Sequence, residues 1–349
     1  MRVVFNLEKL RVIRNISLVL TLVVLMPTLS LAQEEEEISF PLDNFYVERQ
    51  DNALRGFLTK LTLGVSLGYG RTFFKHKLDS FNIYQDSVYG PKIFPTSGSP
   101  QYQSWINKLE LDTAANIPGS YLVSSDSSEL GFKGRGLNIP IKLTLHYEFK
   151  RYRVGVGYSY EFMRLGEFNP TSFQNDIRSF RPPEPNGFMS KYFVVLGGSF
   201  YRWDKVLFVA DANIGGFKPG KNFTNSTIKK GIYANIGVSA EYQFSEYLTA
   251  FVRPSFEFKN YTMNFPEVDR KIKHNMNALY VNVGLAYKLP KLPKCYHPDC
   301  HAQINHAHGN KEYRSRMHGI FKKQNPHYGE NYPKLIKEKR KNKKKLNPY

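Results

Sequence analysis

The chain has 349 residues, of which 15% are aromatic, and a formal net charge of +19. Beyond its first segment it contains no apolar stretch long enough to cross a bilayer as a helix, which excludes a helical protein with several membrane spans. In a cytosolic protein this much positive charge would indicate a nucleic-acid partner. The N-terminal segment argues against that partner.

The first 32 residues have the three-part plan of a secretory signal peptide. Basic residues precede an apolar run from Ile16 to Met26, and the small-residue stretch Ser30-Leu31-Ala32 follows it. The run is shorter than the roughly 20 residues of a transmembrane helix. We predict export with cleavage after Ala32, the alternative being an uncleaved helical anchor. No nucleic acid is then expected as a partner.

Residues 33–57 form a separate N-terminal segment. They open with the acidic run Glu34–Glu37 and then mix apolar with charged residues. This composition is compatible with a short periplasmic segment or with a plug for the domain that follows, and the sequence leaves both open.

Between residues 58 and 290 the main pattern is an alternation in which every second side chain is apolar. Such a pattern predicts β-strands with one apolar face. The segment Leu137–Phe149 is longer than an ordinary strand of about 5–6 residues and suits a tilted membrane strand of about 9–11. Eight segments of this kind begin near Leu61, Leu137, Val154, Tyr192, Val206, Ile232, Leu248 and Leu279, and none of their apolar faces contains a charge.

The links between these segments alternate in length. Short links lie at residues 150–152, 203–205 and 245–246, and the others are longer. This is typical of outer-membrane barrels, in which short turns are periplasmic and long loops are extracellular. The sheet must close, because an open edge in lipid leaves backbone groups without partners. We predict an all-β fold, a transmembrane antiparallel up-and-down β-barrel of about eight strands in outer-membrane lipid, with both termini in the periplasm.

The opposite faces of the strands carry ionisable residues. These face lipid only at high cost, so we expect them to point inward. The interior of an eight-stranded barrel is just wide enough for side chains to fill. We therefore predict a closed interior of paired charges, without a catalytic site. The interior charges are Lys142, Glu148, Arg153, Glu161, Asp211, Glu241, Arg253, Glu257 and Lys259.

The last strand carries a further pattern. Its residues Asn282-Val283-Gly284-Leu285-Ala286-Tyr287-Lys288-Leu289 resemble the C-terminal insertion signal of outer-membrane barrels, although here the chain continues beyond them. Together with the repeated Gly-x-x-Tyr strands, they make residues 60–289 resemble the small outer-membrane β-barrel family of Bacteroidota, the PorT-like barrels. The resemblance implies the fold and the location. It also implies, for some members, a role in type IX secretion, and it implies no active site.

Residues 291–349 form a basic tail with fifteen Lys or Arg against four Asp or Glu. Self-repulsion and low hydrophobicity argue against a packed domain here. Aromatic and apolar residues lie among the charges, and a purely solvating tail, which is the alternative, does not need them. We expect the tail to bind a periplasmic protein or peptidoglycan. The expected contact residues are Tyr328, Tyr332, Leu335, Lys339, Arg340, Lys343, Lys344 and Lys345.

Both cysteines and six of the nine histidines also lie in this tail. Cys295 and Cys300 allow a disulfide, which is natural in an oxidising compartment. Together with His301, His306 and His308 they also offer thiolate and imidazole ligands for Zn²⁺, although the spacing is not that of a familiar zinc finger. Two free thiols are the third possibility. The disulfide is the preferred interpretation, so we expect no metal and no other cofactor.

These patterns predict a non-enzymatic envelope protein in which the barrel holds the tail at a periplasmic partner or the cell wall. One alternative is a barrel enzyme acting on outer-membrane lipid, with candidate residues His76, Asp79, Ser80 and His274. No Gly-x-Ser-x-Gly elbow marks a nucleophile for it. Another alternative is a narrow solute channel, which the charged and filled interior disfavours.

Overall fold

The computed structural model describes most of the barrel and the first part of the tail. The described residues are 53–85, 90–112, 120–124, 129–203, 206–245, 247–300, 302, 305–308 and 311–315. The predicted signal peptide, residues 33–52, His301 and all the expected contact residues of the tail lie outside these ranges. Within them, no helix is both long and apolar enough to cross a membrane.

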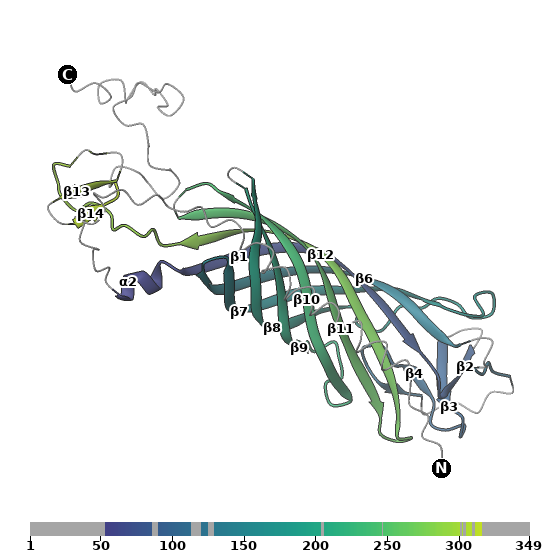
Figure 1. The fold of residues 1–349 in the computed structure, drawn as a ribbon. Helices are drawn as coiled ribbons and strands as arrows, with labels where there is room; N and C mark the ends of the chain where they lie inside the picture. Colours follow the sequence, from purple (N-terminus) through teal and green to yellow (C-terminus); the bar gives the residue numbers. More distant parts are fainter. Residues whose placement is uncertain are drawn as a thin grey trace, which may run out of the picture. The chain divides into compact units, whose positions relative to one another are not determined.

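Eight long strands form a closed antiparallel barrel (Figure 1). Each strand pairs with its neighbour in the chain, and β1 completes the ring by pairing with both β12 and β6. The predicted all-β, up-and-down barrel of eight strands is therefore confirmed. The strands are β1 (Leu61–Lys77), β6 (Gly131–Phe149), β7 (Tyr152–Pro170), β8 (Asn186–Trp203), β9 (Val206–Pro219), β10 (Ile228–Gln243), β11 (Leu248–Phe265) and β12 (Arg270–Lys288).

The closing pair joins the first and the last strand of the barrel. Its register runs from Thr62 opposite Lys288 to His76 opposite His274. The chain therefore enters and leaves the barrel at the same end, which also carries the short links after β6, β8 and β10. We call this the turn end, and the opposite end, where three of the four connections are longer, the loop end.

The outward face of the barrel is apolar. Val65, Leu143 and Val283 are 50%, 49% and 57% exposed, and comparable exposed apolar residues occur on every barrel strand. Val65 lies opposite Leu143 on one side and Leu285 on the other, so these side chains form continuous rows across the strands. An apolar surface of this extent suits a hydrocarbon surrounding and would promote aggregation in water.

The strands are 14 to 19 residues long, which exceeds the about 9–11 residues that a tilted strand needs to cross a bilayer. The extra length lies at the loop end, where β11 and β12 continue as a hairpin and only residues 266–269 connect them. The sequence pattern had suggested a longer link here. Lys271 and Lys273 are exposed on this part of β12. Lysine side chains are readily hydrated, so the two strands stay paired in water beyond the lipid.

The long connection between β1 and β6 folds into a small sheet at the loop end. It consists of β2 (Phe81–Gln85), β3 (Pro91–Pro95), β4 (Tyr102–Ser104) and β5 (Glu110–Leu111). Side chains from this connection, from barrel strands and from other loops pack into one apolar cluster, which we call the loop-end core. Its buried members include Phe81, Ile83, Tyr102, Trp105, Ile106, Phe132, Phe168, Phe265 and Ile272.

At the turn end, short elements flank the barrel on both sides in sequence. The helix α2 (Ala53–Leu58) precedes β1, and the hairpin β13 (His306–His308) and β14 (Lys311–Tyr313) follows β12. The guanidinium of Arg55 donates hydrogen bonds to the carbonyls of Lys291 and Pro290 at 2.8 and 3.0 Å. The backbone N–H of Cys295 donates to the carbonyl of Arg314 at 2.9 Å. The first part of the tail thus contains a small folded unit, which its low hydrophobicity did not predict.

Candidate functional site

The centre of the barrel holds a group of charged side chains that we call the buried network. It consists of Glu161, Lys191, Glu257, Lys259 and Tyr280, all between 0% and 2% exposed. The ammonium of Lys191 lies 2.7 Å from a carboxylate oxygen of Glu161 and 2.7 Å from one of Glu257. That of Lys259 lies 2.7 Å from Glu257 and 3.7 Å from Glu161. Two cations thus balance two anions without access to water.

The buried network crosses the lumen. Glu161 and Lys191 stand on β7 and β8, whereas Lys259 and Tyr280 stand on β11 and β12, and these two pairs of strands occupy opposite sides of the ring. The hydroxyl of Tyr280 donates to Glu161 at 3.1 Å. Because strands point successive side chains to opposite faces, each of these residues alternates with outward apolar neighbours such as Leu279 and Val281. The network therefore closes the barrel at this level.

A cavity of about 350 Å³ lies between the buried network and the turn end. Ion pairs line its wall: Arg153 donates to both carboxylate oxygens of Glu241 at 2.7 and 3.0 Å, and Lys288 donates to Glu148 at 2.5 Å. Arg253 donates to Asp211 at 2.8 and 2.9 Å. None of the five network residues contributes to the lining, so the cavity stops short of the network.

Lys142 also lines this cavity and differs from these paired charges. It is 4% exposed, and among the described residues its ammonium has no hydrogen-bond partner. The ammonium lies 5.5 Å from the ring centroid of Tyr280, at the distance of a cation–π contact. An unsatisfied buried ammonium is costly, and the aromatic face compensates only part of that cost.

The structure places all nine sequence-predicted interior charges inside the barrel. Five line the cavity wall in ion pairs, Lys142 lies at its inner end, and Glu161, Glu257 and Lys259 belong to the buried network. Sequence reasoning missed Lys191 and Tyr280. Both were detectable, since each alternates with lipid-facing residues on its strand, but alternation gives the direction of a side chain and not its partner across the lumen.

The residues considered for a lipid-acting enzyme lie at the loop end. His76 and His274 are 2% and 1% exposed, with ring centroids 4.7 Å apart. The indole N–H of Trp105 donates to His76 at 3.1 Å. Asp79 is exposed and Ser80 is partly exposed. The two histidines are thus brought together, but inside the loop-end core and beneath a tryptophan, where a lipid substrate has no access to them.

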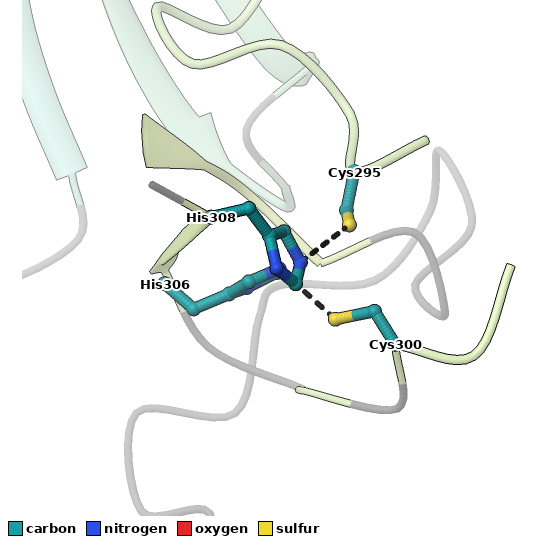
Figure 2. A group of neighbouring side chains, drawn as sticks. All are labelled: Cys295, Cys300, His306 and His308. Atoms are coloured by element: carbon teal, nitrogen blue, oxygen red, sulfur yellow. Dashed lines mark hydrogen bonds between the residues drawn. The ribbon is translucent and has the colours of Figure 1, made fainter. Parts of the chain in front are cut away.

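Four potential metal ligands gather in the folded part of the tail, and we call them the Cys/His cluster. The sulfur of Cys295 lies 3.3 Å from Nε2 of His308, and that of Cys300 lies 3.1 Å from Nε2 of His306 (Figure 2). All four donor atoms lie within 4.8 Å of one another. Cys295 is buried, and the other three residues are half-buried.

Local structure explains this convergence. His306 and His308 are two residues apart on β13, and residues so spaced point to the same face of a strand. Pairing with β14 holds that face, with His306 opposite Tyr313. A turn in which the N–H of Cys300 donates to the carbonyl of His297 at 3.3 Å brings the second sulfur back toward the hairpin. Desolvation and the imidazoles of His306 and His297 lower the pKa of His308, which favours its neutral ring.

The sequence predicted a disulfide between the two cysteines. Cys295 and Cys300 are not joined by a disulfide. Each sulfur faces an imidazole instead of the other sulfur, as Figure 2 shows. The signal that sequence reasoning undervalued is the pair His306-x-His308, which needs a strand rather than a helix to present both rings together.

Comparison with known proteins finds similar barrels and no family. No protein-family model matches the chain, and no curated protein matches it. Among solved structures, the chain is similar to the outer membrane protease OmpT from Escherichia coli over 66% of its length and 96% of that protein, with 13% identity and a TM-score of 0.28. It is similar to the outer membrane protein OprG from Pseudomonas aeruginosa over 66% and 96% of the two chains, with 9% identity and a TM-score of 0.32.

The outer membrane protein AlkL gives the same level of likeness. The similarity covers 66% of this chain and 92% of AlkL, with 10% identity and a TM-score of 0.32. Because identities and TM-scores are this low, the assignment of the fold stands on the closed strand pairing and the apolar outer face of this chain itself.

Proposed function

We propose that this chain is a non-enzymatic outer-membrane barrel that is closed to solutes and holds its basic tail at the periplasmic face, where the tail binds a periplasmic protein or the peptidoglycan. The observation that carries the closed barrel is the buried network, in which Lys191 and Tyr280 meet from opposite sides of the lumen. The loop-end core, which encloses His76 and His274, fills the interior at a second level.

The location and the orientation rest on the barrel surface and on its links. The outward apolar rows suit lipid, and short turns are periplasmic in barrels of this class. With the turn end in the periplasm, α2 and the tail both lie there. The predicted signal peptide supports export to this compartment. The resemblance of the strands to PorT-like barrels adds the more specific proposal that the source is a member of the Bacteroidota and that the partner belongs to a type IX secretion or gliding apparatus.

Two other functions receive less support. A lipid-acting enzyme needs an exposed nucleophile and base, whereas His76 and His274 are buried under Trp105. A channel needs a continuous path, whereas the 350 Å³ cavity at the turn end stops short of the buried network. A lipid-acting enzyme on this barrel scaffold is the rival to test.

Planar-bilayer recording tests the closed barrel. The full-length chain is expected to give no stable conductance steps, and large stable steps would contradict a closed interior. The double variant Glu161→Ala/Lys191→Ala is the matched comparison, because it removes one anion and one cation from the buried network and keeps the net charge. Replacement of His76 and His274 by Ala, followed by analysis of outer-membrane lipids, tests the enzymatic rival, for which an altered lipid composition is the decisive result.

Binding to purified peptidoglycan sacculi and to periplasmic extract tests the tail. The triple variant Lys343→Gln/Lys344→Gln/Lys345→Gln is expected to associate more slowly and with a flatter salt dependence, because salt screens charge over about 8–10 Å. Tyr332→Ala is expected to speed dissociation without a change in the salt slope. The matched control neutralises three exposed lysines of the loop end, Lys229, Lys230 and Lys271. If the wild-type chain binds neither material at physiological salt, a solvated tail is the better interpretation.

A further inference from the structure

The Cys/His cluster lies at the root of the tail and has no part in closing the barrel. Two thiols and two imidazoles converge there on one point, from the loop before β13 and from β13 itself (Figure 2). A thiol is a weak hydrogen-bond donor and a weak acceptor. Hydrogen bonding to the two thiols alone therefore gives little reason for all four side chains to converge. We propose that Cys295, Cys300, His306 and His308 bind one Zn²⁺ ion as a structural tetrahedral site.

The geometry is close to that of such a site. With Zn–S of about 2.3 Å and Zn–N of about 2.0–2.1 Å, neighbouring donor atoms of a tetrahedron lie about 3.3–3.8 Å apart. Two of the four sulfur–nitrogen separations of the cluster are 3.3 and 3.1 Å. The remaining separations are at most 4.8 Å, so the donors have to approach by roughly 1 Å for all four to reach a common ion. Side-chain rotation in a short hairpin supplies a movement of this size.

The donor set selects the metal. Two thiolates with two imidazoles in a tetrahedral arrangement suit Zn²⁺, whereas Ca²⁺ and Mg²⁺ prefer oxygen ligands in larger coordination shells. Four protein ligands also leave no open position for a water or substrate, which is the arrangement of structural rather than catalytic zinc sites. The site would therefore stabilise a fold and would not carry a reaction.

The surrounding unit needs such a staple. The strands β13 and β14 have three residues each, and an isolated two-stranded hairpin is marginally stable in water. Among the described residues of this unit, the buried hydrophobic side chains are those of Cys295 and Tyr313. A bound ion would connect the segment of Cys295, the turn at Cys300 and the hairpin, because the free energy of metal binding becomes free energy of folding in small units of this kind.

The stapled unit is attached to the turn end of the barrel. The guanidinium of Arg314, directly after β14, lies 4.5 Å from the ring centroid of Tyr247 in the turn between β10 and β11. The carbonyl of Tyr247 accepts a hydrogen bond from the N–H of Lys288 at 2.8 Å, so that turn is itself tied to β12. Zinc would therefore fix the direction in which the rest of the tail leaves the barrel. This role does not depend on which partner the tail binds.

The test measures metal on the full-length chain, folded in detergent and purified without chelator or reductant. We expect about one zinc ion per chain, and after exchange Co²⁺ should give the strong visible bands of a tetrahedral thiolate site. Cys300→Ser and His306→Ala should each lose most of the zinc, while both variants keep the heat-modifiable barrel. His297→Ala is the matched control: its ring stacks on His308 at 5.1 Å between centroids but is outside the cluster, so this variant should keep its zinc.

His306→Ala also separates zinc from a disulfide. A disulfide between Cys295 and Cys300 does not need an imidazole, so it would persist in this variant, and the wild-type chain would show no titratable thiol even after unfolding in chelator. The zinc site instead predicts two titratable thiols per chain after unfolding in chelator. A chain without zinc and with oxidised cysteines, or an equal loss of zinc in His297→Ala and His306→Ala, would overturn the assignment. None of these measurements requires the tail partner, so the proposed function can fail while the zinc site stands, and the reverse also holds.

Discussion

Lys191 on β8 and Tyr280 on β12 meet across the lumen, with the lysine Nζ 3.2 Å from the tyrosine hydroxyl, although their strands stand on opposite sides of the ring. The ammonium of Lys191 also lies 4.8 Å from the ring centroid of Tyr280. Contacts between neighbouring strands hold any barrel together. This contact instead connects opposite strands of the barrel across its interior. Variants of the buried network therefore test how much the interior contributes to the stability of the barrel.

Replacement of Lys191 by Met is expected to destabilise the barrel by about 3–5 kcal/mol, because it leaves Glu161 and Glu257 as buried carboxylates short of a cation. Lys142→Met is the matched control. It removes a buried ammonium that has no hydrogen-bond partner among the described residues, so its cost should be much smaller or absent. Urea titration of the lipid-folded chain measures both. Equal losses would show that the pairing in the network is not what stabilises it.

A positive charge on the outer face is expected to be costly, whereas one on the inner face is tolerated. Leu143→Arg places a cation in lipid at roughly 2–4 kcal/mol, since this residue is 49% exposed on the outside. Thr144→Arg, one residue further, points into the turn-end cavity, which Glu148 also lines. The same urea titration compares the two variants. A similar cost for both would mean that the strand register is shifted by one residue.

Trp105→Ala is expected to destabilise the loop end by about 3–5 kcal/mol. The indole is fully buried, packs against Phe132 and Phe180 at 5.7 and 5.1 Å between centroids, and donates to His76. Limited proteolysis of the folded chain should then cut the connection between β1 and β6, while the barrel strands stay protected. Uniform protection of this connection in the variant would show that the loop-end core does not depend on Trp105.

A stop codon after Pro290 is expected to leave a barrel that inserts and remains heat-modifiable. The closing pair between β1 and β12 is complete at Lys288, so the strand pairing of the barrel does not use any of the deleted residues that the structure describes. The truncation removes one acceptor of Arg55, the carbonyl of Lys291, and the contact of Arg314 with Tyr247, and neither belongs to the strand pairing. A fragment that fails to insert would show that the tail is part of the folding unit.

The fold was predictable because period-2 alternation is a local property. The face of the sheet on which Leu143 or Val283 lies can be inferred from the residues next to it in the sequence. The sheet must close because lipid offers no hydrogen-bond partner to an open edge. The loop-end core was not predictable in this way, since Trp105 and Ile106 lie in a connection without periodicity. The pairing of Lys191 with Tyr280 depends on which strands face each other across a closed ring, and no sequence spacing encodes that.

The Cys/His cluster shows an intermediate case. The residue types were recognised, and His306 and His308 were named as ligands. The preference for a disulfide came from the compartment and from the short separation of Cys295 and Cys300. Whether two histidines two residues apart act together depends on local conformation, and only the strand β13 places both rings on one side.

The pairing of β1 with β12 sets the order in which the molecule forms. Thr62 has to find Lys288 at the far end of the barrel sequence, and contacts between such distant residues are the slowest to form because the intervening chain must be ordered first. Until that step, both edge strands expose unpaired backbone groups. Lipid cannot form hydrogen bonds with these groups, and pairing with another copy of the chain would lead to aggregation. The edges of β1 and β12 are therefore the last part of the barrel to gain their backbone partners.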